Sequence, residues 1–120
     1  MPITELNPLR AYLLAKSGTT EELPFGPDAL VFKVLGKMFA IVSWQETPLS
    51  ISLKCDPNLA LLLRATYAAV TPGYHLNKRL WNSVLLDGEV PDDEVEEMID
   101  ASYALVVKGM TKAQRAQLEV

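Results

Sequence analysis

The stretch from Leu30 to Leu53 constrains the fold of this chain most, because it carries strand-type sequence with only short interruptions. Residues 30–35 and 38–44 are rich in β-branched and aromatic side chains, which favour strands. The Gly36–Lys37 pair between them predicts the tight turn of a β-hairpin. Hairpin-length links join antiparallel strands, since a parallel neighbour needs a crossover of about a dozen residues or more. The sequence therefore predicts a mainly antiparallel sheet.

Residues 49–54 predict a third strand whose two faces differ. Ile51 and Leu53 fall on one side, whereas two serines and Lys54 fall on the other. This alternation is typical of a half-exposed strand, and we expect it at an exposed edge of the sheet. The two runs before it are apolar at successive positions, so helices or another chain are expected to cover part of their second face.

Helix-start signals flank these strands. Asn7 followed by Pro8 predicts a first helix that ends near Gly18, because asparagine caps free amides and proline at the first helical position loses no hydrogen bond. Asp56 with Pro57 repeats the signal at a second helix. The stripe expected to face inward on that second helix comprises Leu59, Leu62, Leu63, Thr66 and Tyr67.

Two connecting segments lie between the helices and the strands. Residues 19–28 contain two prolines and Gly26, which predict a turn-rich connection that brings Phe25 to the core. Residues 69–86 are expected to return to the sheet as about two strands. Within them a turn is predicted at 71–73 and a strand at 82–86.

A last long helix is predicted to open at Pro91 and to end at Gly109, followed by a short terminal helix over 111–118. Its expected inward residues are Val95, Met98, Ile99, Ser102, Leu105 and Val106. The resulting order is α-β-β-β-α-β-β-α, an α+β two-layer sandwich in which helices cover one face of a mainly antiparallel sheet of about five strands. With 120 residues, the chain is expected to form a single domain over residues 1–120.

Net charge and cysteine content limit the classes of partner. The net charge is −4, so the field of the whole molecule repels phosphate, and any binding to nucleic acid must be local. The single Cys55 forms no intrachain disulfide, which fits a reducing compartment. The first twenty residues lack a basic segment followed by a long hydrophobic stretch, and no run of about eighteen apolar residues occurs. We expect a cytoplasmic protein without a membrane partner.

Charge is distributed unevenly along the chain. Between Ala29 and Trp81, six basic residues stand against two acidic ones, a local excess of +4. Between Asp87 and Asp100, eight acidic residues occur without a basic one. This polarity predicts a basic sheet face or hairpin tip that meets a nucleic acid while an acidic helix points away. The helix macrodipole offers another explanation for the acids at 92–94, because it stabilises carboxylates in a first turn.

Residues 71–88 gather the side chains best suited to bind a partner, including the only histidine and the adjacent cations. Over the whole chain, the nucleic-acid-binding candidates are Lys37, Lys54, His75, Asn77, Lys78 and Arg79. The cations suit phosphates, His75 and Asn77 offer hydrogen bonds, and Tyr74 or Trp81 suits stacking on an unpaired base. The competing interpretation is structural, with both aromatic residues anchoring the core, His75 bonded to a carbonyl and the cations solvated.

The sequence predicts no catalytic residues, no cofactor and no metal site. Phosphate-cradling glycine motifs are absent, as are EF-hand spacing and a His/Cys ligand set. Cys55 precedes a predicted helix N-terminus, where the dipole favours thiolate, and His75 is the only histidine available as its base. A small buried cysteine is the commoner situation, so we expect Cys55 to be inert.

Four collinear segments resemble the MmcQ/YjbR-like family: FKVLGKMFAIV at 32–42, PLSISLKCDP at 48–57, GYHLNKRLWNSVLLDGEVP at 73–91 and MIDASYALV at 98–106. The resemblance implies a small bacterial domain with one helix, three strands, a helix, two strands and a helix, similar to the secretion-chaperone-like and frataxin-like folds. Members are commonly labelled as DNA-binding proteins, and the family confers no catalytic residues. Iron held by the acidic helix is suggested only by analogy with the frataxin-like fold.

Two functions from different classes follow from these observations. The leading one is a non-enzymatic domain that binds DNA through a basic surface. The alternative is a protein-interaction or chaperone-like module that pairs through its sheet, motivated by the two-sided apolar strands and the edge expected at residues 49–54. Basic residues gathered on one face favour the first function, and a contiguous apolar patch favours the second.

Overall fold

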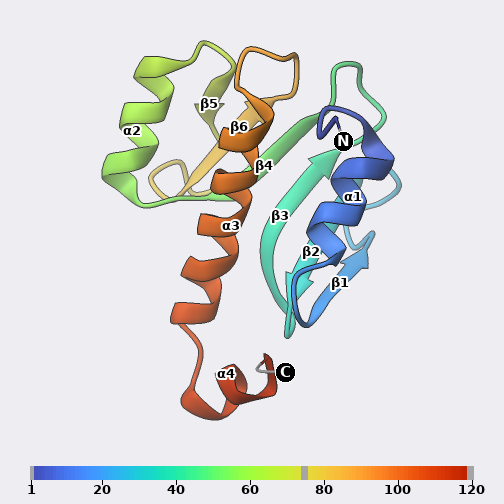
Figure 1. Cartoon of the computed structure of the whole chain (residues 1–120), viewed down its shortest axis with the longest axis vertical. Helices are drawn as coiled ribbons and strands as arrows, with labels where there is room; N and C mark the ends of the chain where they lie inside the picture. The colour runs from blue at the N-terminus through green and yellow to red at the C-terminus, as the bar shows by residue number, and fades with distance from the viewer. Residues whose placement is uncertain (1, 74–75, 119–120) are drawn as a thin grey trace.

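The computed structural model describes residues 2–73 and 76–118. Within these residues, six strands form one sheet accompanied by four helices (Figure 1). The strands are β1 (Thr19–Glu22), β2 (Ala29–Val34), β3 (Lys37–Ser43), β4 (Ser50–Lys54), β5 (Val70–Pro72) and β6 (Trp81–Leu85). The helices are α1 (Leu6–Leu14), α2 (Pro57–Thr66), α3 (Asp92–Lys108) and α4 (Lys112–Leu118). The predicted α+β fold is confirmed, with a sheet one strand larger than expected.

The sheet has the order β1-β2-β3-β4-β6-β5, and all neighbouring strands are antiparallel. β4 therefore lies inside the sheet, and the prediction that residues 49–54 form an exposed edge is wrong. After β4 the chain passes through α2 and β5 before β6 returns to pair with β4. This return covers the side that a simple meander would leave unpaired, so the edges are the short strands β1 and β5.

β1 occupies residues for which the sequence predicts a turn-rich connection. Its four residues pair with Val31–Val34 of β2, and Glu21 in β1 accepts two hydrogen bonds of 2.7 Å from the guanidinium of Arg10 in α1. Both sets of partners are distant in sequence, so a local pattern does not reveal this strand. Phe25 in the loop after β1 is 67% exposed, and the prediction that it enters the core is wrong.

The other strand boundaries differ less from expectation. Thr71 and Pro72 belong to β5 rather than to a turn, and they pair with Ser83 and Asn82. Proline is tolerated there because β5 is an edge strand. β6 begins at Trp81, one residue earlier than predicted.

Helix starts agree with the cap signals in one case and differ in another. Asp56 Oδ2 accepts hydrogen bonds of 3.1 Å from two first-turn amides of α2, as predicted. α1 instead begins at Leu6, with Asn7 inside it rather than capping it. Pro8 is compatible with this earlier start, because amides in the first helical turn have no intrahelical partner. No helix among the described residues is long and apolar enough to cross a membrane.

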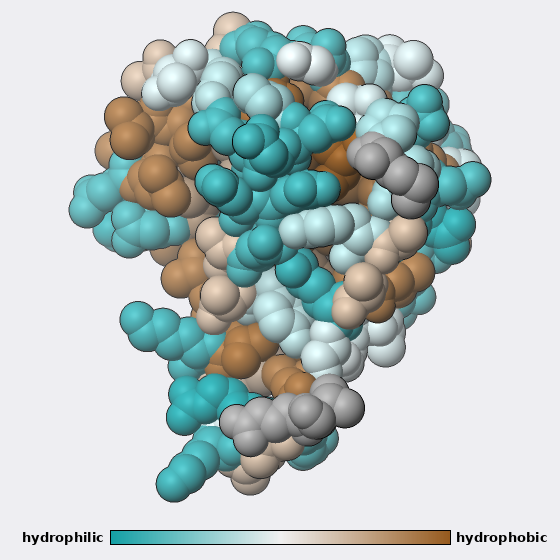
Figure 2. Space-filling view, viewed as in Figure 1, coloured by the Kyte–Doolittle hydropathy of each residue, from teal (hydrophilic) through white to brown (hydrophobic). Residues whose placement is uncertain are grey.

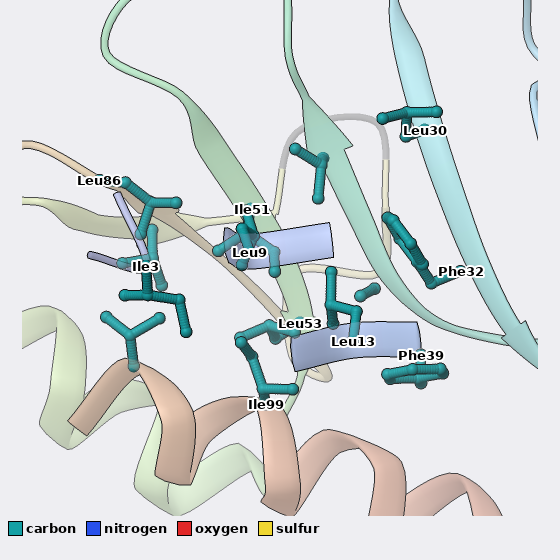
Figure 3. Packing of buried hydrophobic residues seen from close by; sticks show 14 of the residues in the cluster. Ile3, Leu9, Leu13, Leu30, Phe32, Phe39, Ile51, Leu53, Leu86 and Ile99 are labelled. Atoms are coloured by element: carbon teal, nitrogen blue, oxygen red, sulfur yellow. The ribbon is translucent and has the colours of Figure 1, made fainter. Parts of the chain in front are cut away.

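The core lies between the sheet and the helices α1 and α3, which cover the same face (Figures 1 and 3). Leu9 and Leu13 of α1, Phe32 and Ile51 of the sheet, and Ile99 of α3 are fully buried there. The inward face predicted for α3 is confirmed for its buried residues Val95, Ile99, Ser102 and Val106. The remaining two predicted residues of that face, Met98 and Leu105, are half-buried.

The side-chain hydroxyl of Ser102 links α3 to β3 and β4 through two hydrogen bonds. Its Oγ donates to the carbonyl of Phe39 at 2.6 Å and accepts from the amide of Lys54 at 2.9 Å. A buried hydroxyl with both a donor and an acceptor partner avoids the cost of an unpaired polar group. This contact fixes where α3 lies along β3 and β4.

The inward face predicted for α2 is confirmed only in part: Leu63 and Tyr67 pack against the core, whereas Leu59, Leu62 and Thr66 are exposed. Its buried residue is Ala60, whose carbonyl accepts from Asn82 Nδ2 at 3.3 Å, and Arg64 Nε donates to Asn82 Oδ1 at 2.7 Å. These polar contacts set the rotation of the helix. Three leucines of α2 are consequently 42–62% exposed, and Figure 2 shows hydrophobic surface over this helix: Leu59, Leu61 and Leu62.

Candidate nucleic-acid interface

The strand register gathers the predicted cations at one end of the sheet. β3 begins at Lys37, its antiparallel neighbour β4 ends at Lys54, and β6 begins beside Lys54. Lys78 and Arg79 are exposed in the loop directly before β6. Antiparallel pairing therefore brings Lys54 beside the start of β6. It places Lys37 at the same end of the sheet, on the β2–β3 turn that lies nearer α4 (Figure 1). We call Lys37, Lys54, Lys78 and Arg79 the basic end.

Acidic residues occupy the opposite end of the sheet. Asp87 and Glu89 follow the last residue of β6, and residues 92–94 form the first turn of α3. Glu89 Oε1 also accepts from the amide of Ala69, just before β5, at 3.4 Å. Acidic residues thus gather at the end of the strands opposite Lys54, where they repel phosphate. Glu94 and Glu97 of α3, however, line a pocket together with Lys54.

Asn77 shapes the loop that carries two of the cations. Its Oδ1 accepts from the amide of Arg79 at 3.0 Å, and its carbonyl accepts from the amides of Leu80 and Trp81 at 3.1 and 2.9 Å. Such a turn around an asparagine is a common way to fix a short loop. The side-chain oxygen of Asn77 therefore stabilises the loop itself.

Arg64 of α2 supports the same loop, although sequence analysis does not identify it as a site residue. Its Nη2 donates to the carbonyl of Lys78 and, at 3.3 Å, to that of Trp81. Because the guanidinium is engaged with Asn82 and with these carbonyls, Arg64 positions the backbone while the side chains of Lys78 and Arg79 face solvent. A lone arginine in the leucine-rich α2 was the available signal in the sequence.

Of the two aromatic candidates, Trp81 is buried and Tyr74 lies outside the described residues. Trp81 is only 8% exposed, which agrees with the structural interpretation of this residue. It is packed so closely beside Gly73 that a Cβ added there would lie 2.8 Å from Trp81 Cβ. Tyr74 and His75 lie outside the described residues, so their stacking and hydrogen-bonding roles stay predictions.

Small hydroxyls line the sheet face that points away from the helices. Ser52 lies opposite Ser83, and their Oγ atoms are 2.8 Å apart. Ser83 in turn lies opposite Thr71 of β5, and Ser43 lies opposite Ser50. The alternation in residues 49–54 predicts that two of these serines face away from the core. Cross-strand register, which the sequence does not reveal, adds the others.

Cys55 does not have the environment of a nucleophile. It is buried, and this burial, reinforced by the charge of Asp56, raises the pKa of its thiol. A raised pKa leaves the thiol protonated at neutral pH, whereas the thiolate is the reactive form. His75, the base considered for this pair, lies outside the described residues. No three acidic, histidine or cysteine side chains within residues 2–73 and 76–118 are grouped so as to hold a metal ion.

A polar cluster on the covered side connects α1 to α3. Tyr12 Oη donates to Asp100 Oδ1 at 2.7 Å, and Lys16 Nζ lies 2.5 Å from the same oxygen. Burial acts to raise the pKa of Asp100, but the hydrogen bonds from Lys16 and Tyr12 outweigh it and hold that pKa below its usual value. Lys16 also lies 5.6 Å from the ring centroid of Tyr103. We assign this cluster a structural role.

Comparison with known proteins relates the whole chain to one family. The YjbR family model matches residues 14–105. The protein YjbR of Escherichia coli K12 is 36% identical over 113 residues, which cover 94% of this chain and 96% of that protein. The protein YbdF of Escherichia coli O157:H7 is 38% identical over 95 residues, which cover 79% of this chain and 78% of that protein. Neither name states an activity, a ligand or a partner.

Solved structures show the same fold. A crystal structure of a Deinococcus radiodurans protein with a DUF419 domain matches with a TM-score of 0.92 and 40% identity, covering 98% of this chain and 90% of that one. A Pseudomonas syringae protein matches with a TM-score of 0.70 and 28% identity, covering 83% of this chain and 98% of that one. Because the family model spans residues 14–105 and the YjbR protein of Escherichia coli K12 is 36% identical over 94% of this chain, the chain belongs to the YjbR family.

Proposed function

We propose that this protein is a non-enzymatic domain that binds nucleic acid through phosphate contacts at the basic end. The observation that carries the proposal is the strand register, which places Lys54 beside the loop cations and Lys37 at the same end of the sheet, in a molecule of net charge −4. Lysine and arginine neutralise phosphates whatever the base sequence. The acids at the opposite end repel the same phosphates, so an approaching strand is oriented toward the basic end.

Hydrogen bonds that order the loop before β6 strengthen this proposal. Asn77 and Arg64 together hold the backbone carbonyls and amides from Asn77 to Trp81. A loop that is already ordered loses less conformational entropy when its side chains bind, so more of the interaction energy remains as affinity. Lys78 and Arg79 thus start from a backbone that is fixed before the ligand arrives.

The salt dependence of DNA binding tests the proposal. Fluorescence anisotropy with a labelled duplex would give affinity as a function of salt concentration. About four phosphate contacts predict a slope of log affinity against log salt of roughly −3 to −4. Replacing Lys78 and Arg79 together with alanine is expected to flatten the slope by about one to two units and to weaken binding to every sequence alike.

A matched variant controls for net charge. Lys112→Ala with Arg115→Ala changes the net charge by the same amount in α4, which lies at the far end of α3 from α2 and the start of β6 (Figure 1). The control is expected to keep the wild-type slope. Equal losses in both double variants would show that overall charge governs binding. Absence of binding at low salt would remove the proposal altogether.

A second candidate function, protein interaction, is favoured by the exposed leucines of α2. The edges β1 and β5 are too short to offer much backbone for pairing through the sheet, so α2 replaces the sheet as the expected contact. An apolar strip can pair with itself about a twofold axis, which makes a second copy the partner to test. Sedimentation should then show concentration-dependent dimers that Leu61→Glu abolishes. A monomer at every concentration would eliminate this candidate.

A further inference from the structure

The sheet face opposite the helices contains a cavity of about 670 Å3. Its lining includes hydroxyl-bearing side chains on three strands and Thr71 of β5, with Phe25, Leu76 and Leu85 as apolar walls. Ligand sites in proteins occupy about 300–1,000 Å3. The cavity is therefore large enough for a nucleobase with its sugar.

The hydroxyls of the lining are arranged in two rows across the sheet. The first row runs from Ser52 through Ser83 to Thr71, and the second joins Ser43 to Ser50. A hydroxyl both donates and accepts hydrogen bonds, so such a floor can satisfy a ligand edge that carries donors and acceptors side by side. Heterocyclic bases have edges of this kind.

Phe25 stands beside these hydroxyls and is 67% exposed. Large aromatic side chains bury much of their surface in most proteins, so a ring left in solvent at a cavity offers its face to a ligand. Flat heterocycles stack on such rings with little dependence on their identity. Leu23, two residues earlier, is 51% exposed but does not line the cavity, which makes it a matched control.

The side chains that line this cavity differ in charge from those of the basic end beside it. Among the described lining residues, Glu46 is the one charged side chain, so the cavity suits an uncharged group. Lys54 lies two residues beyond Ser52 on the same strand face, about 7 Å away. A pocket lined mainly by uncharged side chains, with Lys54 beyond Ser52, matches the two parts of a nucleotide, its base and its phosphate.

We propose that this cavity receives one unpaired base of a single-stranded nucleic acid whose phosphates lie on the basic end. The inference rests on the proposed function and adds a preference for single strands. The base would stack on Phe25 and direct its polar edge toward Ser52 and Ser83. Bases of a duplex are paired and stacked within the helix, so a duplex would reach the basic end without filling the cavity.

Affinities for a labelled single-stranded DNA 12-mer and for its duplex test this inference. Phe25→Ala is expected to weaken single-strand binding about tenfold at constant salt, because one stacking contact is lost. The salt slope should stay unchanged, since no phosphate contact is removed. Phe25→Trp should restore affinity, and Leu23→Ala should leave it unaltered. Phe25→Ala is expected to melt like the wild type, because the ring is exposed.

A second measurement tests binding in the cavity with a ligand that carries no phosphate. Thymidine titrated into isotopically labelled protein should shift the amide resonances of Ser52, Thr71 and Ser83. Absence of these shifts overturns the inference even if DNA binds. Equal effects of Phe25→Ala and Leu23→Ala, or equal affinity for duplex and single strand, overturn it as well. In those cases the loss of salt slope on changing Lys78 and Arg79 still decides the proposed function separately.

Discussion

The two faces of the sheet draw on the same strands and differ in almost every property. Under the helices, Phe32, Ile51 and Leu53 are buried in the core. On the open face, Ser52 and Lys54 alternate with them along β4. Because successive side chains of a strand point to opposite faces, one set of residues stabilises the fold and the other is available to bind. Substitutions on the open face should therefore test binding without unfolding the protein.

The largest expected effect falls on the covered face. Phe39 is fully buried and meets Tyr103 edge-on, with ring centroids 5.4 Å apart. Phe39→Ala should lower the free energy of unfolding by about 3 to 5 kcal/mol, measured by urea denaturation. Ser52→Ala on the open face should cost no more than about 1 kcal/mol, the usual scale of one hydrogen bond. A similar cost for both would show that the two faces are not independent.

Trp81 tests the contrast between the two faces of the sheet, because it is buried although it lies on the open face. Its position opposite Lys54 places it beside the basic end, yet it is hardly exposed. Trp81→Ala should lower the unfolding free energy by about 3 kcal/mol, near the low end for large aromatic deletions. Thermal melting together with DNA binding checks this. An unchanged melting temperature with lost binding would make Trp81 a ligand contact and contradict its structural role.

Asp100 should give the covered side a modest pH dependence. Because its pKa is lowered in the folded protein, its contribution to stability is present above the ordinary aspartate pKa of about 3.9 and is lost as pH falls through the folded value. Urea denaturation at neutral pH and near pH 3 should show a smaller loss in Asp100→Asn than in the wild type. The difference should be small, since the carboxylate is half exposed. Identical pH profiles would show that Lys16 and Tyr12 do not stabilise its charge.

The smallest expected effect concerns Cys55, which follows the last residue of β4. Its raised pKa and burial predict slow labelling by iodoacetamide in the native protein and fast labelling after denaturation. Mass spectrometry after brief treatment measures both. Rapid native labelling below neutral pH would indicate a thiolate and would reopen the nucleophile hypothesis.

Local signals in the sequence predicted the elements that depend on near neighbours. The hairpin of β2 and β3, the Asp56 cap of α2 and the inward face of α3 follow from residues a few positions apart. The inward face predicted for α2 was only partly right: Leu63 and Tyr67 pack inward, but the contact between Arg64 and Asn82 leaves other leucines of the helix exposed. Glu21 in β1 likewise depends on Arg10, which no pattern within residues 19–28 indicates.

For the candidate site, the sequence by itself determined which cations exist and that the serines of residues 49–54 face away from the core. Only the tertiary structure decided that Lys54 lies beside the loop before β6 and that Lys37 falls at the same end of the sheet. It also decided that Ser83 and Thr71 join Ser52 in one row. The physical reason is that strand order and register arise from pairing between distant segments. Side-chain alternation, by contrast, is a property of each strand alone.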